Sequence, residues 1–423
     1  MERAKDPKFV FHSLAHLIDQ EALVRAYHRL RKDAAVGADG ITKEQYGKEL
    51  RSNIRDLHER LRTKRWRHQP IRRVYITKEN GKSRPLGISS TEDKIVQDAL
   101  REILDAIYEP LFCECSYGFR RGRNAHDAMR TLHEVLYRGE ASWILEIDVE
   151  SYFDSIDRKL LQEQIQERVS DGSLKRLIGK CLHVGVLDGT EYSEPDEGTV
   201  QGSVLSPVLG NIYLHHVLDD WFERDAVPRL RGKARLIRYA DDAVFAFERE
   251  DDAHKVLEVL HKRFARFGLR LHPEKTRIVP FQRPDRNTGA GKGPGSFDFL
   301  GFTVYWRRSR KGLWVPRMKT RKARVQRFLR TIAEWCRRHR HDEVKDQHAA
   351  LVRRIAGNFR YFGVNGNVQA LCRVRGVCEA IWRKWLNRRS QRTSKTWDEF
   401  HALLRKWPLP RARVYVPIWQ VPP

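Results

Sequence analysis

The sequence predicts an α+β fold in which an antiparallel sheet is followed by a helical C-terminal region. Between residues 70 and 302, short apolar runs of strand length alternate with longer stretches whose apolar residues recur every three or four positions. Asn80 and Gly81 separate two of the short runs and give a strong hairpin signal. From 316 to 390 the helical spacing recurs. This order of elements is typical of an α+β core with an appended helical domain.

The N-terminal part predicts helices around one hairpin. Residues 12–65 carry apolar side chains at helical spacing, interrupted by a glycine-containing turn at 37–40. Residues 71–88 have the pattern of the hairpin, and residues 91–112 return to the helical pattern.

The middle of the chain predicts two strand ends that carry aspartate. A glycine- and arginine-rich loop at 116–123 and a helix at 125–137 precede a strand that runs into Asp148. The elements expected after it are helices at 157–185, a loop at 194–202, a helix at 207–223, a hairpin holding Asp241 and Asp242, a helix at 252–267, a strand at 275–279 and a surface loop at 283–296.

Charge is distributed unevenly along the chain. The whole sequence has 81 Lys+Arg and 55 Asp+Glu, a net charge of +26. Residues 303–423 hold 30 of these bases and 7 of these acids, a net of +23, which leaves +3 for the first 302 residues. Tryptophans are interleaved with the bases, so this region is not a disordered tail. A folded basic region predicts a polyanionic partner, and nucleic acid is the usual one.

The charge shift places a domain boundary near residue 305. Three helices are expected in the basic region, followed by a short extended terminus. We therefore expect four regions: an N-terminal helical extension at 1–70, a catalytic core at 71–304, a basic helical domain at 305–390 and a C-terminal extension at 391–423.

Other patterns exclude several protein classes. The six cysteines contain no CxxC pair, which argues against a structural zinc site. The charged start lacks the apolar stretch of a signal peptide, and no run of about 18 apolar residues predicts a membrane helix. We expect a cytoplasmic protein with no membrane partner.

Asp148, Asp241 and Asp242 are the strongest candidates for catalysis. Each follows or begins an apolar run of strand length, so the carboxylates can meet at one edge of a sheet. Hard divalent ions such as Mg²⁺ prefer carboxylate oxygens, and two such ions catalyse in-line phosphoryl transfer. On a basic chain, a two-Mg²⁺ site, in which Mn²⁺ can substitute, predicts a nucleic-acid polymerase.

Seven ordered segments resemble the sequence boxes of reverse transcriptases, especially those encoded by group II introns. The resemblance covers residues 35–302 strongly and continues more weakly to 390. The segments are 116–128, 148–157, 201–207 (QGSVLSP), 239–242 (YADD), 271–276, 299–302 and 357–362.

This resemblance implies a right-hand polymerase with fingers and palm, followed by a helical thumb, or maturase, domain. The metal ligands it implies are Asp148, Val149, Asp241 and Asp242. It also implies contacts to the incoming nucleotide. Basic side chains would contact the triphosphate, and a bulky aromatic ring would block a 2′-hydroxyl. These nucleotide contacts are Lys78, Arg84, Phe153, Gln201 and Gly202.

The resemblance further implies contacts to template and primer. Arginine forks bind phosphates bidentately, and a tight turn with glycine can approach a nucleic-acid backbone closely. The residues expected to make these contacts are Arg120, Arg121, Arg123, Lys275, Leu300 and Gly301.

The function implied is an RNA-directed DNA polymerase of group II intron type, a mobile-element enzyme and maturase that binds its intron RNA and assists splicing. Its partners would be an RNA template, the intron RNA, a DNA primer or target and dNTPs, in a bacterial cytoplasm. A homodimer is compatible with the sequence, and no Cys/His cluster of an HNH endonuclease occurs. Two alternatives stay open: a domesticated or defence-associated reverse transcriptase acting on another RNA, and a splicing-only RNA-binding maturase.

Overall fold

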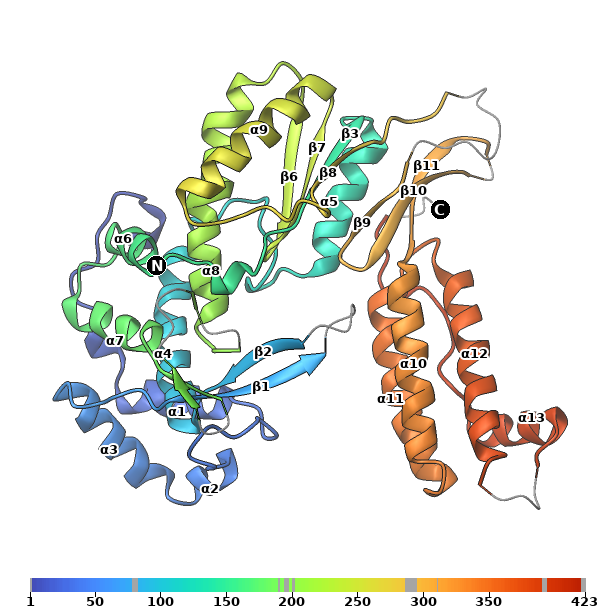
Figure 1. Ribbon diagram of the computed structural model, residues 1–423, viewed down its shortest axis with the longest axis horizontal. Helices are drawn as coiled ribbons and strands as arrows, with labels where there is room; N and C mark the ends of the chain where they lie inside the picture. The colour runs from blue at the N-terminus through green and yellow to red at the C-terminus, as the bar shows by residue number, and fades with distance from the viewer. Residues whose placement is uncertain are drawn as a thin grey trace.

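The computed structural model describes residues 2–77, 83–188, 191–193, 198–199, 202–285, 295–309, 311–389 and 394–419. Within these ranges the chain is a mixed α+β structure that ends in a helical part, which confirms the predicted fold class. Figure 1 shows N-terminal helices and a hairpin on one side, a sheet packed between helices above them, and the C-terminal helices on the other side.

A four-stranded antiparallel sheet, here called the central sheet, has the strand order β6-β7-β3-β8. Alternate residues of β7 enter different cores: Phe245 packs with apolar residues of α9, and Val244 packs with those of α5. Because successive strand residues point to opposite faces, α9 and α5 cover the two sides (Figure 1). The elements are α5 (Ala125–Arg138), β3 (Trp143–Ile147), β6 (Ala234–Tyr239), β7 (Asp242–Phe247), α9 (Glu250–Arg266) and β8 (Arg277–Pro280).

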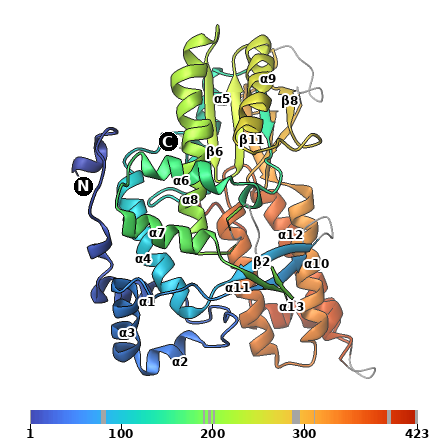
Figure 2. The same ribbon diagram turned by 60° about the vertical axis from the view of Figure 1, so that its left-hand side comes forward.

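The N-terminal helices and the hairpin form a second body below the central sheet (Figure 2). β1 (Ile71–Thr77) and β2 (Ser83–Ile88) pair antiparallel up to Thr77 and Ser83, so the hairpin is confirmed, while its tip lies outside the described residues. The other elements are η1 (Glu2–Lys5), η2 (Ala15–Leu17), α1 (Gln20–Arg29), α2 (Lys43–Lys48), α3 (Leu50–Arg62), α4 (Thr91–Tyr108), α6 (Arg158–Gln166), α7 (Gly172–Leu182), β4 (Val186–Asp188) and β5 (Glu191–Ser193).

A long helical segment links the two bodies. α8 (Ser206–Leu214) starts with a proline in its first turn and runs through the main core. It continues into wider, π-helical turns before the chain enters β6. These segments are η4 (His215–Asp219), η5 (Phe222–Ala226) and the 3-10 turn η6 (Val227–Arg229), and a further 3-10 turn, η3 (Tyr152–Asp154), follows β3.

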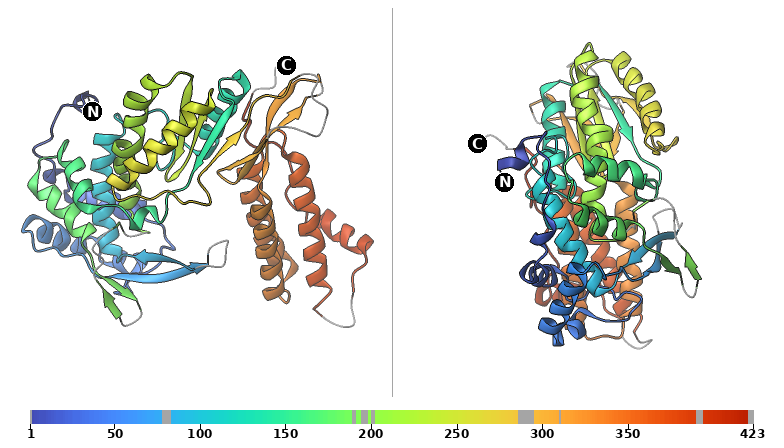
Figure 3. Two further views of the ribbon diagram at one scale, coloured as in Figure 1. Left: turned by 45° about the horizontal axis from the view of Figure 1, so that its top comes forward. Right: turned by 90° about the vertical axis from the view of Figure 1, so that its left-hand side faces the viewer.

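The C-terminal part begins with a three-stranded sheet and continues as helices. β10 lies between β9 and β11, and α10 packs mainly against α12. Figure 3 shows these helices, coloured orange to red, on the side of the molecule toward which strands β1 and β2 extend. The elements are β9 (Phe297–Phe299), β10 (Phe302–Arg308), β11 (Trp314–Thr320), α10 (Lys322–Arg338), α11 (Val344–Phe362), α12 (Val368–Leu386) and α13 (Trp397–Lys406).

Three sequence predictions for this part were inexact. Residues 316–320 were expected to be helical but belong to β11, and the boundary near 305 falls inside β10, because a change in charge does not mark where strands pair. The terminus after 390 is not only extended, since α13 begins at a Thr396 capping box. Its Asp398, Glu399 and basic last turn are ordinary helix-end signals.

The segment after α13 returns to the rest of the molecule. Val416 forms a β-bridge with Val364, and Trp419 stacks on His133 of α5 with ring centroids 4.6 Å apart. Arg130 of α5 donates to the Pro417 carbonyl oxygen at 3.2 Å. The chain end thus connects the C-terminal helices to the helix that covers the central sheet. Among the described helices, none is long and apolar enough to cross a membrane.

Candidate active site

The turn between β6 and β7 presents Asp241 and Asp242. Tyr239 pairs with Asp242, so the turn consists of Ala240 and Asp241 alone. Ala240 takes a φ of 58°, a left-handed conformation that is uncommon for a residue with a Cβ. The catalytic turn, as residues 239–242 are called below, is therefore tight and unusual in its backbone.

The neighbouring strand β3 brings Asp148 to the same edge of the sheet. Its last residue, Ile147, pairs with Ala243 of β7, and Asp148 follows directly. Asp148 and Asp242 therefore face each other one position beyond this last pair of β3 and β7. The three aspartates lie together at one sheet edge, as the sequence predicts.

Electrostatics at this edge are dominated by negative charge. Desolvation by the surrounding protein, together with the charges of Asp241 and Asp148, raises the pKa of Asp242 to about 7, although Arg324 and Lys275 oppose the rise and the residue keeps an exposed surface. The Lys275 ammonium donates a hydrogen bond to the Asp148 carboxylate. One positively charged side chain therefore offsets part of the negative charge. A further cation would relieve the remaining repulsion among the three carboxylates.

The chemistry of these residues suits a hard divalent ion. In the part of the chain that the structure describes, no three His, Cys, Asp or Glu side chains form a complete metal site. Mg²⁺ does not need one, because it usually takes one or two carboxylates and completes its shell with water and substrate phosphates. Crowded carboxylates at an open sheet edge fit that requirement.

Val149, the fourth expected metal ligand, would act through its backbone. Its side chain is buried, and its backbone forms a β-bridge with Leu271. The carbonyl oxygen of Asp148 accepts a hydrogen bond from His272 N at 2.8 Å. The segment that carries Lys275 is therefore fixed to the end of β3 by backbone contacts.

Phe153 lies in η3, immediately after the β3 edge. The side chain is half-buried, and a Cβ placed on Gly210 of α8 would come within 3.1 Å of its ring. The hydroxyl of the adjacent Tyr152 donates to the Gly210 carbonyl oxygen at 2.6 Å. The ring is thus supported by α8, so it could serve as the rigid barrier expected of it.

The other expected nucleotide contacts are only partly described. Lys78 and Gln201 lie outside the described residues, and for Arg84 only the backbone, paired with Ile76, is described. Gly202 takes a φ of 104°, and a Cβ there would lie 2.6 Å from the Gly87 carbonyl oxygen. Its missing side chain therefore allows contact with β2 of the hairpin.

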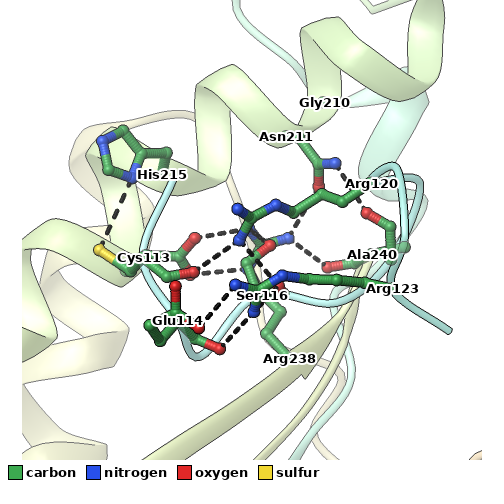
Figure 4. Close-up of polar contacts among 12 residues, drawn as sticks. Cys113, Glu114, Ser116, Arg120, Arg123, Gly210, Asn211, His215, Arg238 and Ala240 are labelled. Atoms are coloured by element: carbon green, nitrogen blue, oxygen red, sulfur yellow. Dashed lines mark hydrogen bonds and ion pairs between the residues drawn. The ribbon is translucent and has the colours of Figure 1, made fainter. Parts of the chain in front are cut away.

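The three arginines expected at template phosphates have different environments, two of which, those of Arg120 and Arg123, are drawn in Figure 4. Arg120 is 8% exposed, and its guanidinium donates to Glu109, to the Cys113 carbonyl oxygen at 2.7 Å and to the Ser116 carbonyl oxygen at 2.9 Å. The expectation of a phosphate contact does not suit Arg120, because its donors already bind the protein.

The other two arginines remain candidates to different degrees. Arg123 donates to Glu114 at 2.6 Å and lies over the Tyr117 ring, so it too supports the loop. Arg121 has a side chain that is 66% exposed, and its nearest carboxylate, Asp105, is 3.9 Å away. A sequence pattern of three arginines cannot separate these cases, since burial depends on partners elsewhere in the fold.

Leu300 and Gly301 form the turn between β9 and β10. The Tyr361 hydroxyl of α11 donates to the Leu300 carbonyl oxygen at 2.9 Å, and Arg321 N donates to the Gly301 carbonyl oxygen at 3.0 Å. Burial is the main reason that the pKa of Tyr361 is raised to about 12, and the negative charge of Asp242 adds a smaller contribution. The turn therefore joins the C-terminal helices to the catalytic edge.

Sequence reasoning missed a set of buried polar residues behind the catalytic turn. Arg238, Asp219, Asn211 and Ser116 are each at most 3% exposed and are joined by hydrogen bonds. Arg238 directly precedes the YADD segment, but its partner Asp219 is separated from it by 19 residues. The signal available was an arginine that alternates with the apolar Ala234 and Leu236 along β6, whereas Arg235 lies on the other face.

Comparison with known proteins agrees with this geometry. Residues 76–304 match the family model described as "Reverse transcriptase (RNA-dependent DNA polymerase)". Protein YkfC of Escherichia coli K12 is 32% identical over 73% of this chain and 87% of its own length. Group II intron-encoded protein LtrA of Lactococcus lactis is 34% identical over 59% of this chain and 43% of its own length.

A further relative has a shorter match. The uncharacterized 91 kDa protein in the cob intron of Schizosaccharomyces pombe is 36% identical over 49% of this chain and 25% of its own length. The chain thus spans less than half of these two intron-associated relatives but most of YkfC. Membership of this family implies an RNA template, dNTPs and, in general, divalent metal ions. Because the family model matches more than half of the chain, the protein belongs to the reverse transcriptase family and is an RNA-dependent DNA polymerase.

Proposed function

We propose that this reverse transcriptase is of the group II intron type and acts also as a maturase. The observation that carries the catalytic part is the meeting of Asp148 with Asp241 and Asp242 at one sheet edge, beside Lys275. The similarity to LtrA, whose name states that it is encoded by a group II intron, supports the intron type.

In this proposal each group at the edge has a separate task. Two Mg²⁺ ions, or Mn²⁺ in their place, would supply the activation of the primer 3′-hydroxyl and of the leaving phosphate. Asp148 and Asp241, with the Val149 carbonyl group, would hold them, and Asp242 would support that set. Lys275 neutralises Asp148 until a ligand arrives, which limits repulsion in the free enzyme.

The surrounding residues would orient the substrates. Phe153, supported by Gly210, would exclude the 2′-hydroxyl of a ribonucleotide, while Lys78, Arg84, Gln201 and Gly202 would contact the incoming dNTP. Arg121 and, less directly, Arg123 would face template phosphates. The Leu300–Gly301 turn, which the Tyr361 hydroxyl holds at the Leu300 carbonyl oxygen, would press on the primer.

The proposed maturase role is supported by the positive charge of the C-terminal region. Residues 303–423 carry a net +23, and many arginines of α10 are exposed, as an RNA-binding surface requires. We keep the four regions 1–70, 71–304, 305–390 and 391–423 as proposed units, with β10 crossing the limit at 305.

The match to 87% of the length of YkfC, whose name mentions no intron, supports a second candidate: a reverse transcriptase with another natural RNA.

Two experiments test the proposal. Purified protein should extend a DNA primer on an RNA template with Mg²⁺, and absence of synthesis with both Mg²⁺ and Mn²⁺ would contradict the catalytic assignment. RNA that co-purifies from the native host should then be sequenced. Enrichment of one structured RNA that surrounds the reading frame supports the maturase role, whereas enrichment of an unrelated RNA supports the second candidate.

A further inference from the structure

A fully buried ion pair lies directly behind the catalytic turn. Arg238 of β6 and Asp219 of η4 both have side chains with 0% exposure. The guanidinium binds the carboxylate through two nitrogens, Nε at 2.6 Å and Nη2 at 2.5 Å. Burial alone would lower the pKa of Arg238, but the Asp219 charge raises it, so the guanidinium stays charged.

The remaining donors of this guanidinium reach the catalytic turn and the loop beside it (Figure 4). Nη1 donates to the Ala240 carbonyl oxygen at 2.9 Å and to Asn211 Oδ1 at 3.1 Å. Nη2 also donates to Ser116 Oγ at 2.7 Å. Ala240 is the residue with a φ of 58°, so the arginine holds the unusual backbone of the turn at its carbonyl group.

A second contact fixes the same turn from the side of the 116–118 loop. Tyr117 N donates to the Arg238 carbonyl oxygen at 2.8 Å, and Asn211 Nδ2 donates to the Gly118 carbonyl oxygen at 2.8 Å. A Cβ on Gly118 would lie 2.2 Å from Ala240 N, so the loop touches the turn backbone closely. Arg238 and Asn211 thus hold both sides of the turn.

Stability alone does not explain this arrangement. Burying two charges costs hydration, and replacing a buried pair by apolar residues is often neutral or stabilising. Asp219 also ends a π-helical segment, and such segments occur frequently at functional sites. Because this pair contacts the turn that carries Asp241, positioning of that turn gives a reason for burying two charges there.

We propose that Arg238 is a positioning residue, held by Asp219 and Asn211, that sets the Ala240 carbonyl group and thereby the direction of the Asp241 carboxylate. The inference rests on the proposed role of Asp148 and Asp241 as metal ligands. Residues behind metal ligands commonly change metal affinity or activity by about 10- to 100-fold when replaced.

The test uses a double variant of the full chain, Arg238→Met with Asp219→Leu. This variant removes both charges and so leaves no uncompensated buried charge, but the oxygens of Ala240, Asn211 and Ser116 lose a donor; it should fold with a lowered melting temperature that stays above the assay temperature. We expect the Kd for Mn²⁺, measured without nucleic acid by electron paramagnetic resonance, to rise about 10- to 100-fold. We also expect kcat to fall by a similar factor, with unchanged KM for the template-primer.

Asn211→Ala provides a milder second variant, because it leaves the ion pair in place and removes the contacts to Arg238 and Gly118. It should weaken Mn²⁺ binding in the same direction. Asp252→Ala is the matched control: it removes a 1%-exposed carboxylate that accepts from Arg231 N and Gly232 N near the start of β6, at the other end of the strand. It should lower the melting temperature and leave Mn²⁺ affinity unchanged.

The outcomes separate the inference from the proposed function. Wild-type Mn²⁺ affinity and kcat in a folded double variant or in Asn211→Ala would overturn the inference alone, provided that Asp241→Asn loses both. If Asp241→Asn itself keeps Mn²⁺ affinity and synthesis, the metal-ligand assignment fails and the inference fails with it. Equal loss of Mn²⁺ affinity in Asp252→Ala would show a general effect of destabilisation and would also overturn the inference.

Discussion

The central sheet and the C-terminal helices differ in how their charged residues are placed: buried and paired near the sheet, exposed and numerous on the helices. Around the sheet, the first 302 residues carry a net +3, and key charges such as Arg238 and Asp219 are buried and paired atom by atom. The region 303–423 carries +23, and arginines of α10 such as Arg330 and Arg337 are exposed. Precise geometry therefore depends on single residues near the sheet, whereas attraction of a polyanion is shared among many residues of the helices.

The largest effect expected from this difference is in salt dependence. If the C-terminal helices make six to ten phosphate contacts, RNA affinity should fall by about 10³- to 10⁵-fold between 50 and 200 mM salt. The triple variant Lys322→Ala, Arg330→Ala and Arg337→Ala should reduce the slope of log affinity against log salt by up to about three. Filter binding of a structured RNA measures both, and a flat titration of the wild type would remove the basis for an RNA grip.

A smaller effect is expected at Phe153, where one side chain near the sheet should control selection of the sugar. Phe153→Ala removes the ring that is supported by Gly210, so ribonucleotide incorporation relative to deoxynucleotide should rise about 10- to 100-fold. Single-nucleotide extension with dNTP and with rNTP measures the ratio. Phe153→Tyr keeps a ring at this position and should retain the discrimination; an unchanged ratio in Phe153→Ala would assign Phe153 to packing alone.

The smallest effects are expected for two adjacent arginines, Arg120 and Arg121, in the free energy of unfolding and in template binding. Arg120→Ala should lower the free energy of unfolding by about 2–3 kcal/mol, because buried carbonyl groups lose a charged donor. Arg121→Ala should change it by less than about 0.5 kcal/mol, since its side chain is largely exposed. Only Arg121→Ala should reduce the salt slope of template binding, by about one. Denaturant unfolding and template binding would show the opposite pattern if the burial argument were wrong.

The sequence predicted local features well and long-range partners poorly. The hairpin at 71–88, the strand ends at Asp148 and Asp242 and the turn at Leu300 follow from patterns of a few residues, which alternation and turn chemistry determine. The pairing of Arg238 with Asp219 and the burial of Arg120 depend on contacts made only after folding. No local pattern contains that information.

The helix α13 was missed although local signals for it were present. It is short and only Phe400 among its residues is buried, but Trp397, Phe400, Leu403 and Leu404 recur at helical spacing. Its capping box at Thr396 and Glu399 was readable, but the prolines that follow favoured an extended terminus. The return of the chain end to His133 on α5 could not have been predicted from spacing at all.

The most direct test measures synthesis and RNA binding in one preparation of Asp241→Ala. We predict that primer extension on an RNA template falls at least about 10³-fold, because a carboxylate at the reacting centre is lost. RNA affinity and its salt slope should match those of the wild type, since the C-terminal helices are unchanged. Retained synthesis, or a parallel loss of synthesis and RNA binding, would contradict the separation of chemistry from grip.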